Sequence, residues 1–279
     1  FGTPEQAFDS SEVFTNALAA KENMRTESFA QKLCVSSKGN VDCIKNAQLE
    51  EGQKGLLFSL SNHKVLYANG IYDKVYPASI TKIMTAMLAL QSGKLNDTVT
   101  ITQDNVTLED GSQVCGFVAG DQVTLDQLLH CLLVYSGNDA ASAIAEYVGG
   151  NTENFVQMMN DYAAKLGCTG THFSNPHGLQ DENHYTTPYD IYLMLNEAFT
   201  YPEFTEITEL PSYTVTYTGS DGTEKSTTLT ATDHYLTGEA TAPKDVTILG
   251  GKTGTTEVAG NCLAILTPVS YTHLTLPTN

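Results

Sequence analysis

Short apolar runs and helical spacing follow one another along the first half of the chain. Two apolar runs, 55–60 and 64–69, flank the polar residues 61–63, a pattern typical of a β-hairpin. After Pro77, apolar residues recur with helical spacing, and Gly93 then favours a helix end. The pattern predicts a hairpin followed by a helix.

Helical spacing continues through the middle of the chain, where Gly and polar residues separate the segments. The predicted helices are 125–132, 139–147, 154–166 and 190–198.

Two further hairpins are predicted toward the C-terminus. Segments 213–218 and 226–232 alternate around an Asp-Gly pair, which suits the left-handed backbone of a tight turn. Segments 246–255 and 262–270 flank a polar turn.

Strands near both chain ends with a helical block between them predict an α+β fold. We expect one antiparallel β-sheet built from strands at both chain ends, packed with a helical lobe at about 95–205. A cleft between the two lobes would hold the site. This domain would span 49–270. Residues 1–48 are polar, with a weak helical stretch at 14–33, and are predicted to form an N-terminal arm or linker.

The composition is globular but strongly acidic. Lys and Arg together number 14 against 32 Asp and Glu, which gives a net charge of −18. Such a chain repels phosphate backbones, so nucleic-acid binding is excluded, as is a basic patch that binds a membrane surface. No apolar run reaches the roughly 18 residues that a membrane span needs. The chain starts with Phe1 and shows no signal peptide, so we expect that a leader was removed or that the N-terminus is incomplete.

Cysteine and histidine spacing predicts neither a metal site nor a cofactor. The six cysteines contain no CxxC pair, and His172, His177 and His184 match no ligand spacing. Cys34 and Cys43 are close enough in sequence to close a short disulfide loop. For each of the other cysteines, a small buried thiol is an equally good interpretation.

Three short motifs carry candidate chemistry, in the order SxxK, SxN and KTG. Their members are Ser79 and Lys82, Ser136 and Asn138, and Lys252-Thr253-Gly254. Each motif alone is weak, since Ser79 could be a helix cap and each lysine a solvated charge. A second SxxK occurs in the predicted turn at 61–64. The ordered set, each motif in a fitting context, favours a catalytic site.

The physical chemistry favours a serine nucleophile. Ser79 at a helix start would lie near free backbone N–H groups, and Lys82 one turn later shares its face. Burial and a second cation such as Lys252 would lower the pKa of Lys82 and make it a base. Ser136 would relay a proton, and Asn138 would orient Lys82 and the substrate.

The KTG strand offers a place for a substrate. Lys252 and the hydroxyls of Thr253 and Thr255 could bind a carboxylate, and Gly254 would let a substrate backbone lie close to the strand. The N–H groups of Ser79 and Thr255 could form an oxyanion hole.

With these motifs the sequence resembles the serine penicillin-binding proteins and β-lactamases, in which Asp can stand in place of Gly137. It is most similar to the low-molecular-weight D-alanyl-D-alanine carboxypeptidases. The stretches that carry the resemblance, within roughly 50–270, are YPASITK, SGNDAA, THFSNPHGL and GKTGTT.

The resemblance implies a β-lactamase/transpeptidase-like fold and a serine D,D-carboxypeptidase. Ser79 would be acylated, with Lys82 as base, Ser136 as relay and Asn138 as positioner. Lys252, Thr253, Gly254 and Thr255 would bind the substrate. The implied partner is a peptidoglycan stem peptide ending in D-Ala-D-Ala, with β-lactams as covalent inhibitors.

The same resemblance implies a cellular location, and the last residues of the chain suggest a separate origin. The protein would be exported to the outer face of the bacterial cytoplasmic membrane, with contact to the membrane only through a lost N-terminal anchor. Residues 271–279 are similar to translated adaptor sequence, so we expect a non-native tail.

Two alternatives stay open. One is a β-lactamase or esterase on the same fold. In class A β-lactamases the Glu of a Glu-x-x-Leu-Asn segment activates the deacylating water, and the sequence has no such segment between Ser136 and Lys252, which argues against this alternative. The other is a truncated, non-catalytic wall-binding fragment.

Overall fold

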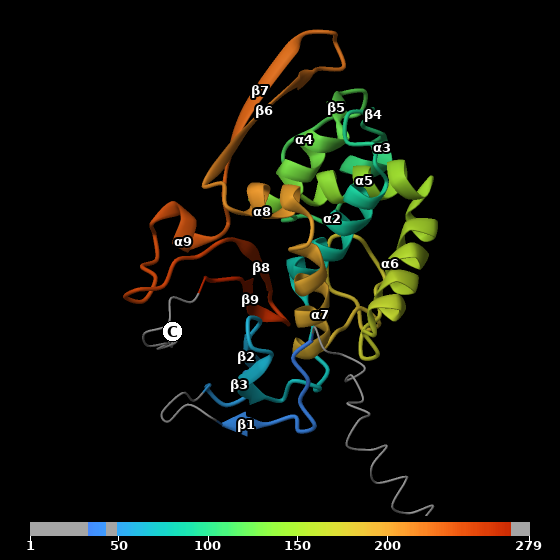
Figure 1. The fold of residues 1–279 in the computed structure, drawn as a ribbon. Helices are drawn as coiled ribbons and strands as arrows, with labels where there is room; N and C mark the ends of the chain where they lie inside the picture. The colour runs from blue at the N-terminus through green and yellow to red at the C-terminus, as the bar shows by residue number, and fades with distance from the viewer. Residues whose placement is uncertain (1–32, 43–48, 269–279) are drawn as a thin grey trace, which may run out of the picture.

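A computed structural model, which describes residues 33–42 and 49–268, places the helices of residues 78–208 in one lobe, with the hairpins and the short helix 234–237 around it (Figure 1). The helices are η1 (Ala78–Thr81, 3-10), α2 (Lys82–Gln91), α3 (Gln103–Val106), α4 (Leu125–His130), η2 (Cys131–Tyr135, π), α5 (Asn138–Gly149), α6 (Thr152–Leu166), α7 (Pro188–Ala198), α8 (Pro202–Thr208) and α9 (His234–Thr237). The predicted helices are confirmed, with the first turn at residue 79 being 3-10 rather than α.

The strands form antiparallel ladders throughout. They are β1 (Val41–Asp42), β2 (Gly55–Ser59), β3 (Lys64–Asn69), β4 (Thr98–Thr100), β5 (Gln122–Thr124), β6 (Ser212–Thr218), β7 (Glu224–Thr230), β8 (Gly251–Thr256) and β9 (Gly260–Ile265). All three predicted hairpins are present, and the β6–β7 hairpin projects beyond the helices (Figure 1).

The strands from the two chain ends do not share one ladder in the described ranges. The sheets are β1-β3-β2, β4-β5-β6-β7 and β8-β9. The first and the last of these both pack against α7, so side-chain packing joins them rather than backbone hydrogen bonds. The sequence predicted one sheet from the strands at both chain ends, and the structure has two separate ladders there, β1-β3-β2 and β8-β9. The predicted α+β layout of strands around a helical lobe is confirmed.

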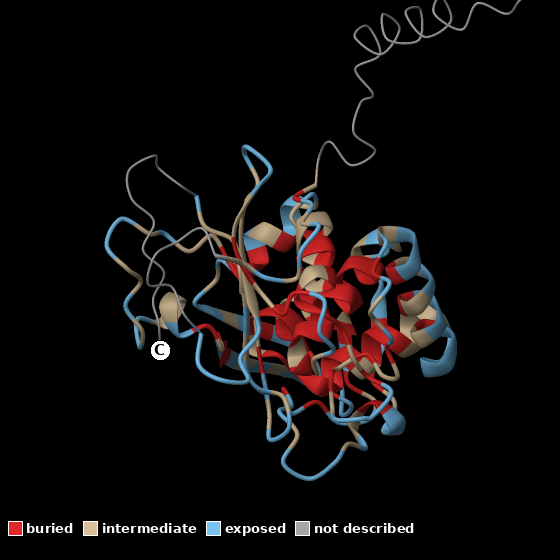
Figure 2. Cartoon of the chain, turned by 90° about the horizontal axis from the view of Figure 1, so that it is seen from below, coloured by how far each residue is buried: buried red, intermediate tan, exposed pale blue. Residues whose placement is uncertain are grey.

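Helix α2 lies at the centre of the helical lobe and is buried on nearly every side (Figure 2). Its apolar residues pack against α5, α6 and α7, because a helix that is apolar all round must be covered all round. The surrounding helices are amphipathic and capped. Thr124 and Gln127 form a capping box at α4, and Asn151 caps α6.

Part of the predicted N-terminal arm packs on the domain. Strand β1 pairs with β3, and the fully buried Cys34 donates its N–H to the Tyr192 hydroxyl at 2.8 Å. The boundary at residue 48 stays a prediction. The predicted helix at 14–33, Cys43 and the predicted tail at 271–279 lie wholly or almost wholly outside the described residues.

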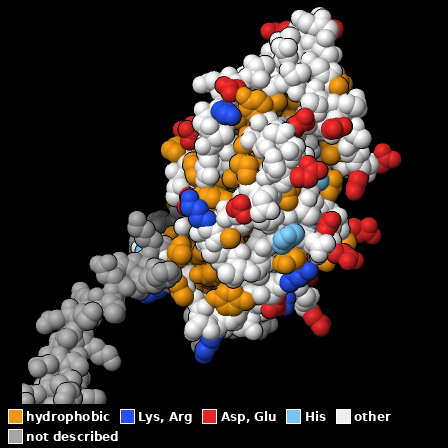
Figure 3. Space-filling view, turned by 90° about the vertical axis from the view of Figure 1, so that its right-hand side faces the viewer, with side chains coloured by type: hydrophobic (Ala, Val, Ile, Leu, Met, Phe, Trp, Pro, Cys, Tyr) orange, Lys and Arg blue, Asp and Glu red, His pale blue; other side chains and the backbone are white. Residues whose placement is uncertain are grey.

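Acidic side chains are spread over the face shown in Figure 3, in keeping with the net charge of −18. Within residues 33–42 and 49–268, no helix has the length and apolar character that crossing a membrane requires.

Candidate active site

Ser79 lies in the 3-10 turn that leads into α2, and it is half-buried. The residue before it, Ala78, has a φ of +48°, a left-handed conformation that is uncommon for a residue with a side chain. In a 3-10 turn residues three apart eclipse each other, which aligns Ser79 with Lys82. The Lys82 Nζ donates to the Ser79 Oγ at 2.9 Å.

Lys82 is fully buried and has three hydrogen-bond acceptors. Besides Ser79, its Nζ contacts the Asn138 Oδ1 at 2.7 Å and the His177 carbonyl oxygen at 2.8 Å. Burial, and secondarily the nearby Lys252 charge, hold the pKa of Lys82 well below its usual range. Both effects disfavour the ammonium form, so the site favours a neutral amine beside the serine hydroxyl.

The SxN motif lies where a π-helix ends. Ser136 follows η2 with a left-handed φ of +65°, and its N–H and that of Gly137 both bond the Cys131 carbonyl. Helix α5 begins directly after this turn, and its first residue is Asn138. The Ser136 Oγ is buried and has no hydrogen-bond partner within the described ranges. It is therefore free to serve a reacting group.

Gly137 has no room for a side chain. An added Cβ would overlap the Cys115 Sγ. The residue at 137 is thus small for a steric reason, since its backbone angles are ordinary.

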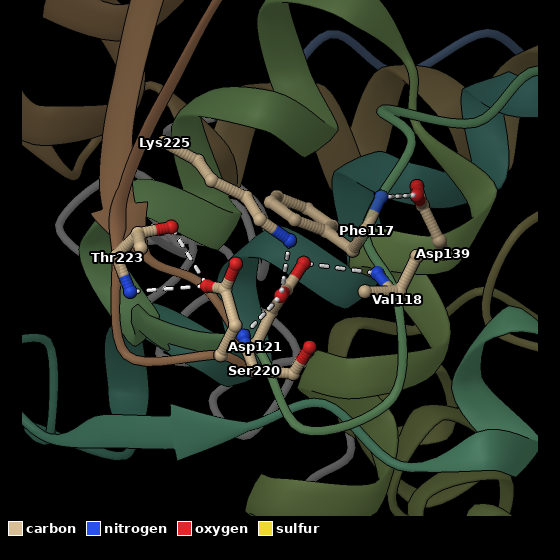
Figure 4. Close-up of polar contacts among 8 residues, drawn as sticks. Phe117, Val118, Asp121, Asp139, Ser220, Thr223 and Lys225 are labelled. Carbon is tan, nitrogen blue, oxygen red and sulfur yellow. Dashed lines mark hydrogen bonds and ion pairs between the residues drawn. The ribbon is translucent and has the colours of Figure 1, made fainter.

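The segment 111–121 borders the SxN turn and is fastened by two buried carboxylates (Figure 4). Asp139 accepts the N–H of Cys115 at 2.9 Å and that of Phe117 at 3.4 Å. Asp121 accepts the N–H of Val118 at 3.0 Å and is paired with Lys225 at 3.1 Å. The carboxylates therefore link the SxN turn to the turn end of the β6–β7 hairpin.

The loop 171–187 supplies the floor beneath Lys82. The Pro176 carbonyl accepts from the Thr85 Oγ1 at 2.6 Å, and the next carbonyl, that of His177, accepts from Lys82. Gly178 has a φ of +91°, and a Cβ there would overlap the Ala78 carbonyl. The loop and the nucleophile turn are thus in backbone contact.

His184 joins the same loop to the turn at Ser79. Its Nδ1 accepts the Ser174 N–H at 3.1 Å, so its Nε2 carries the proton and donates to the Thr81 Oγ1 at 2.7 Å. Burial lowers the pKa of His184 to about 4 and that of His177 to about 3. Both rings are neutral and structural at neutral pH. No group of three metal-ligating side chains occurs in residues 33–42 and 49–268.

Strand β8 closes the other side of the site. A Cβ on Gly254 would lie 2.8 Å from the Ser79 backbone nitrogen, so the strand passes directly beside the nucleophile turn. Lys252 is buried, and its Nζ donates to the Thr253 carbonyl at 2.9 Å. Burial lowers the pKa of Lys252 to about 7.

The threonine hydroxyls expected to bind a carboxylate have protein partners. The Thr253 Oγ1 bonds the Thr232 Oγ1 at 2.6 Å, and the Thr255 Oγ1 donates to the Asn261 Oδ1 at 3.1 Å. A ligand carboxylate there would have to share or displace these bonds.

The structure brings the three predicted motifs together around Ser79, from one turn, one helix start and one strand. Motif reasoning did not find the His177 carbonyl, Asp139 or Gly178 as parts of the site. A family model described as D-alanyl-D-alanine carboxypeptidase, peptidase S11, matches residues 45–274. The chain belongs to the D-alanyl-D-alanine carboxypeptidase family.

Curated relatives carry the same name. The chain is 36% identical over 162 residues to D-alanyl-D-alanine carboxypeptidase DacF of Bacillus subtilis (strain 168), covering 57% of this chain and 41% of DacF. It is 40% identical over 149 residues to DacC of Escherichia coli (strain K12), covering 50% of this chain and 37% of DacC. The alignments thus span less than half the length of these carboxypeptidases.

Solved structures confirm the fold of this carboxypeptidase-family chain. The Streptomyces K15 DD-transpeptidase superposes with a TM-score of 0.68 at 27% identity, covering 75% of this chain and 82% of that one. The D-alanyl-D-alanine carboxypeptidase from Mycobacterium tuberculosis H37Rv gives 0.67 at 28% identity, covering 82% and 89%. The predicted transpeptidase-like fold is therefore confirmed.

Proposed function

We propose that this protein is a serine D,D-carboxypeptidase that removes the terminal D-alanine of peptidoglycan stem peptides through an acyl-enzyme on Ser79. The observation that carries the proposal is the set of three acceptors around the buried Lys82 Nζ. A neutral amine has two N–H bonds, which the Asn138 Oδ1 and the His177 carbonyl accept. In the neutral amine the contact with the Ser79 Oγ at 2.9 Å therefore reverses its direction, so that the Ser79 hydroxyl donates to the Lys82 lone pair, which is the arrangement a general base needs.

The reaction follows from this geometry. Lys82 takes the Ser79 proton as the Ser79 Oγ attacks the carbonyl of the D-Ala-D-Ala bond. The oxyanion would accept the N–H groups of Ser79 and Thr255. The unpartnered Ser136 hydroxyl passes a proton from Lys82 to the leaving amine. In the second half, Lys82 takes a proton from a water molecule as that water attacks the ester carbonyl, and it delivers this proton to the departing Ser79 Oγ.

Lys252 would bind the terminal carboxylate of the substrate. Lys252 is buried on a strand whose Gly254 passes beside the Ser79 backbone nitrogen. A β-lactam carries a carboxylate and a reactive amide in a similar relation, so it would acylate Ser79 as a substrate mimic. We place the protein at the outer face of the cytoplasmic membrane, where this substrate lies.

The test is intact mass spectrometry after incubation with benzylpenicillin, on the parent and on Ser79→Ala. We expect one stable adduct on the parent and none on the variant. Consumption of penicillin without an adduct would point to a β-lactamase instead. An intact drug and an unmodified protein that melts cooperatively would refute the proposal.

A second assay separates hydrolysis from transfer, since the structural neighbours include a DD-transpeptidase. A diacyl-L-Lys-D-Ala-D-Ala peptide is incubated with and without glycine as acceptor. Release of D-alanine without a glycyl product supports the carboxypeptidase. A dominant glycyl product would make the protein a transpeptidase.

A further inference from the structure

A small recess lies beside Lys252, between β8, the segment after β7, η2 and α8. The hydrogen-bonded pair Thr232 and Thr253 also lines it. Two of its lining residues are charged, Lys252 and Asp233, and the others are apolar residues, glycine and threonine. We call it the Asp233 recess.

The two charged residues have complementary unused hydrogen-bonding capacity. Asp233 is 8% exposed, and its Oδ1 accepts the Tyr235 N–H at 2.9 Å as the N-cap of α9. Its Oδ2 is buried with no partner among the residues that the structure describes. The Lys252 ammonium has three N–H bonds, and the Thr253 carbonyl accepts one. A buried carboxylate oxygen without a partner is costly, so it needs an opposite charge or a water nearby.

Asp233 is held in place on both sides of the recess. The neighbouring Thr232 donates its N–H to the Val134 carbonyl of η2 at 3.1 Å, and its hydroxyl bonds that of Thr253 on β8 at 2.6 Å. The carboxylate is therefore fixed relative to the strand that carries Lys252.

Within the described part of the chain, the charges around Lys252 come from two elements. The segment after β7 contributes Asp233, and α2 contributes Lys82, while η2 and α8 present apolar residues and Thr208 to the recess. Burial lowers the pKa of Lys252 to about 7, and Asp233 opposes this shift. At neutral pH the charge of Lys252 is thus finely balanced, and it depends on Asp233. The Lys252 charge in turn helps to lower the pKa of Lys82.

We propose that Asp233 is a positioning residue that keeps Lys252 protonated across the Asp233 recess, so that Lys252 can bind the substrate carboxylate. This inference rests on the proposed function for the role of Lys252, but not for its charge. Through Lys252, Asp233 also favours the neutral form of Lys82. One residue that touches no substrate thereby supports opposite charge states in the two buried lysines.

The first test measures the charge directly and needs no activity. The ¹³Cε and ¹⁵Nζ resonances of labelled lysine are titrated in the parent, in Asp233→Asn and in Asp233→Ser, with Lys252→Arg to assign the signal. Both variants remove the charge and keep an oxygen that can cap α9. We expect the pKa of Lys252 to fall by on the order of one pH unit in both. Leu236→Ala, which alters the recess without changing its charge, should leave the pKa unchanged.

The second test follows benzylpenicillin acylation from pH 5 to 10. The descending limb of the second-order rate constant should move to lower pH in both Asp233 variants, with about a tenfold loss at pH 8. The loss should lie in drug binding rather than in the acylation step, and Asp233→Glu should restore part of it.

The two proposals fail in different ways. An unchanged Lys252 pKa and an unchanged descending limb in the folded Asp233 variants would overturn the role of Asp233. A parent that no β-lactam acylates, with the Lys252 pKa still dependent on Asp233, would overturn the proposed function and leave the charge relation standing.

Discussion

Lys82 and Lys252 are both almost fully buried, yet their surroundings differ. Lys82 has three acceptors at 2.7–2.9 Å and a second lysine as its charged neighbour. Lys252 has one acceptor and an aspartate across a small recess. Burial lowers the pKa of both lysines, so burial alone does not set their chemistry. The neighbours do, because a second lysine further disfavours the charged form of Lys82, whereas Asp233 favours the charged form of Lys252.

The largest expected effect comes from replacing each of the two lysines by arginine. Arginine stays charged at every accessible pH, so it can replace an anchor but not a base. We expect Lys82→Arg to lower the rate of penicillin acylation by about 10³-fold. Lys252→Arg should stay within about tenfold of the parent. Equal losses in two variants with parental melting temperatures would contradict the division of roles.

The next largest effect concerns the loop beneath Lys82. In Gly178→Ala the new Cβ meets the Ala78 carbonyl, so we expect a loss of about 3 kcal/mol in the free energy of unfolding and slower acylation. Gly222→Ala is the matched control, because Gly222 has a similar φ of +82° with open space around it. Its cost should be about 1 kcal/mol, from backbone strain alone. Urea unfolding measures both, and equal losses would show that the contact with the nucleophile turn is unimportant.

A smaller effect is expected from Asp139→Asn. The amide replaces one acceptor oxygen with a donor facing backbone N–H groups, which should cost about 2 kcal/mol of unfolding free energy. Asp190→Asn provides a comparison, because Asp190 is also buried and accepts a backbone N–H, from Gly170, rather than one from the segment beside the SxN turn. Both variants should be less stable, but only Asp139→Asn should slow acylation at a temperature where both are folded. Equal acylation rates in the two variants would show that Asp139 does not influence the site around Ser79.

The smallest expected effect is the pH dependence of the unfolding free energy that is caused by His184, in the loop beneath Lys82. The pKa of His184 is about 4 in the folded protein against 6.5 when exposed, so the unfolded chain binds the proton more readily. Stability from this group is therefore complete above pH 6.5 and is lost as the pH falls toward 4. Between pH 6.5 and 5.5 we expect a loss of about 1 kcal/mol that is absent in His184→Asn. His63→Asn, at an exposed position, should keep the parental slope; an unchanged slope in His184→Asn would contradict the assignment.

The sequence predicted the elements with strong local signals. Helical spacing located α2, α5, α6 and α7, and an Asp-Gly pair located the β6–β7 turn. The order of the three motifs predicted that Ser79, Lys82 and Asn138 meet, and they do at hydrogen-bond distance. The catalytic and binding roles assigned to these residues stay predictions until acylation is measured.

Features without a side-chain signature were not found from the sequence. The third acceptor of Lys82 is a backbone carbonyl, which any residue at 177 would provide. The left-handed φ of Ser136 depends on the π-turn before it, which no residue type marks. Asp233 was not singled out from the sequence, because its relation to Lys252 depends on how two distant segments pack. The single sheet was wrong in detail because strand pattern alone does not tell which edges meet.

The Cys115 thiol that occupies the space beside Gly137 has an evolutionary consequence. The two positions share one volume, so neither can grow unless the other shrinks. An acidic residue at 137 therefore overpacks the site unless the residue at 115 is smaller or its side chain moves aside. We expect the residue types at 115 and 137 to vary together in this family.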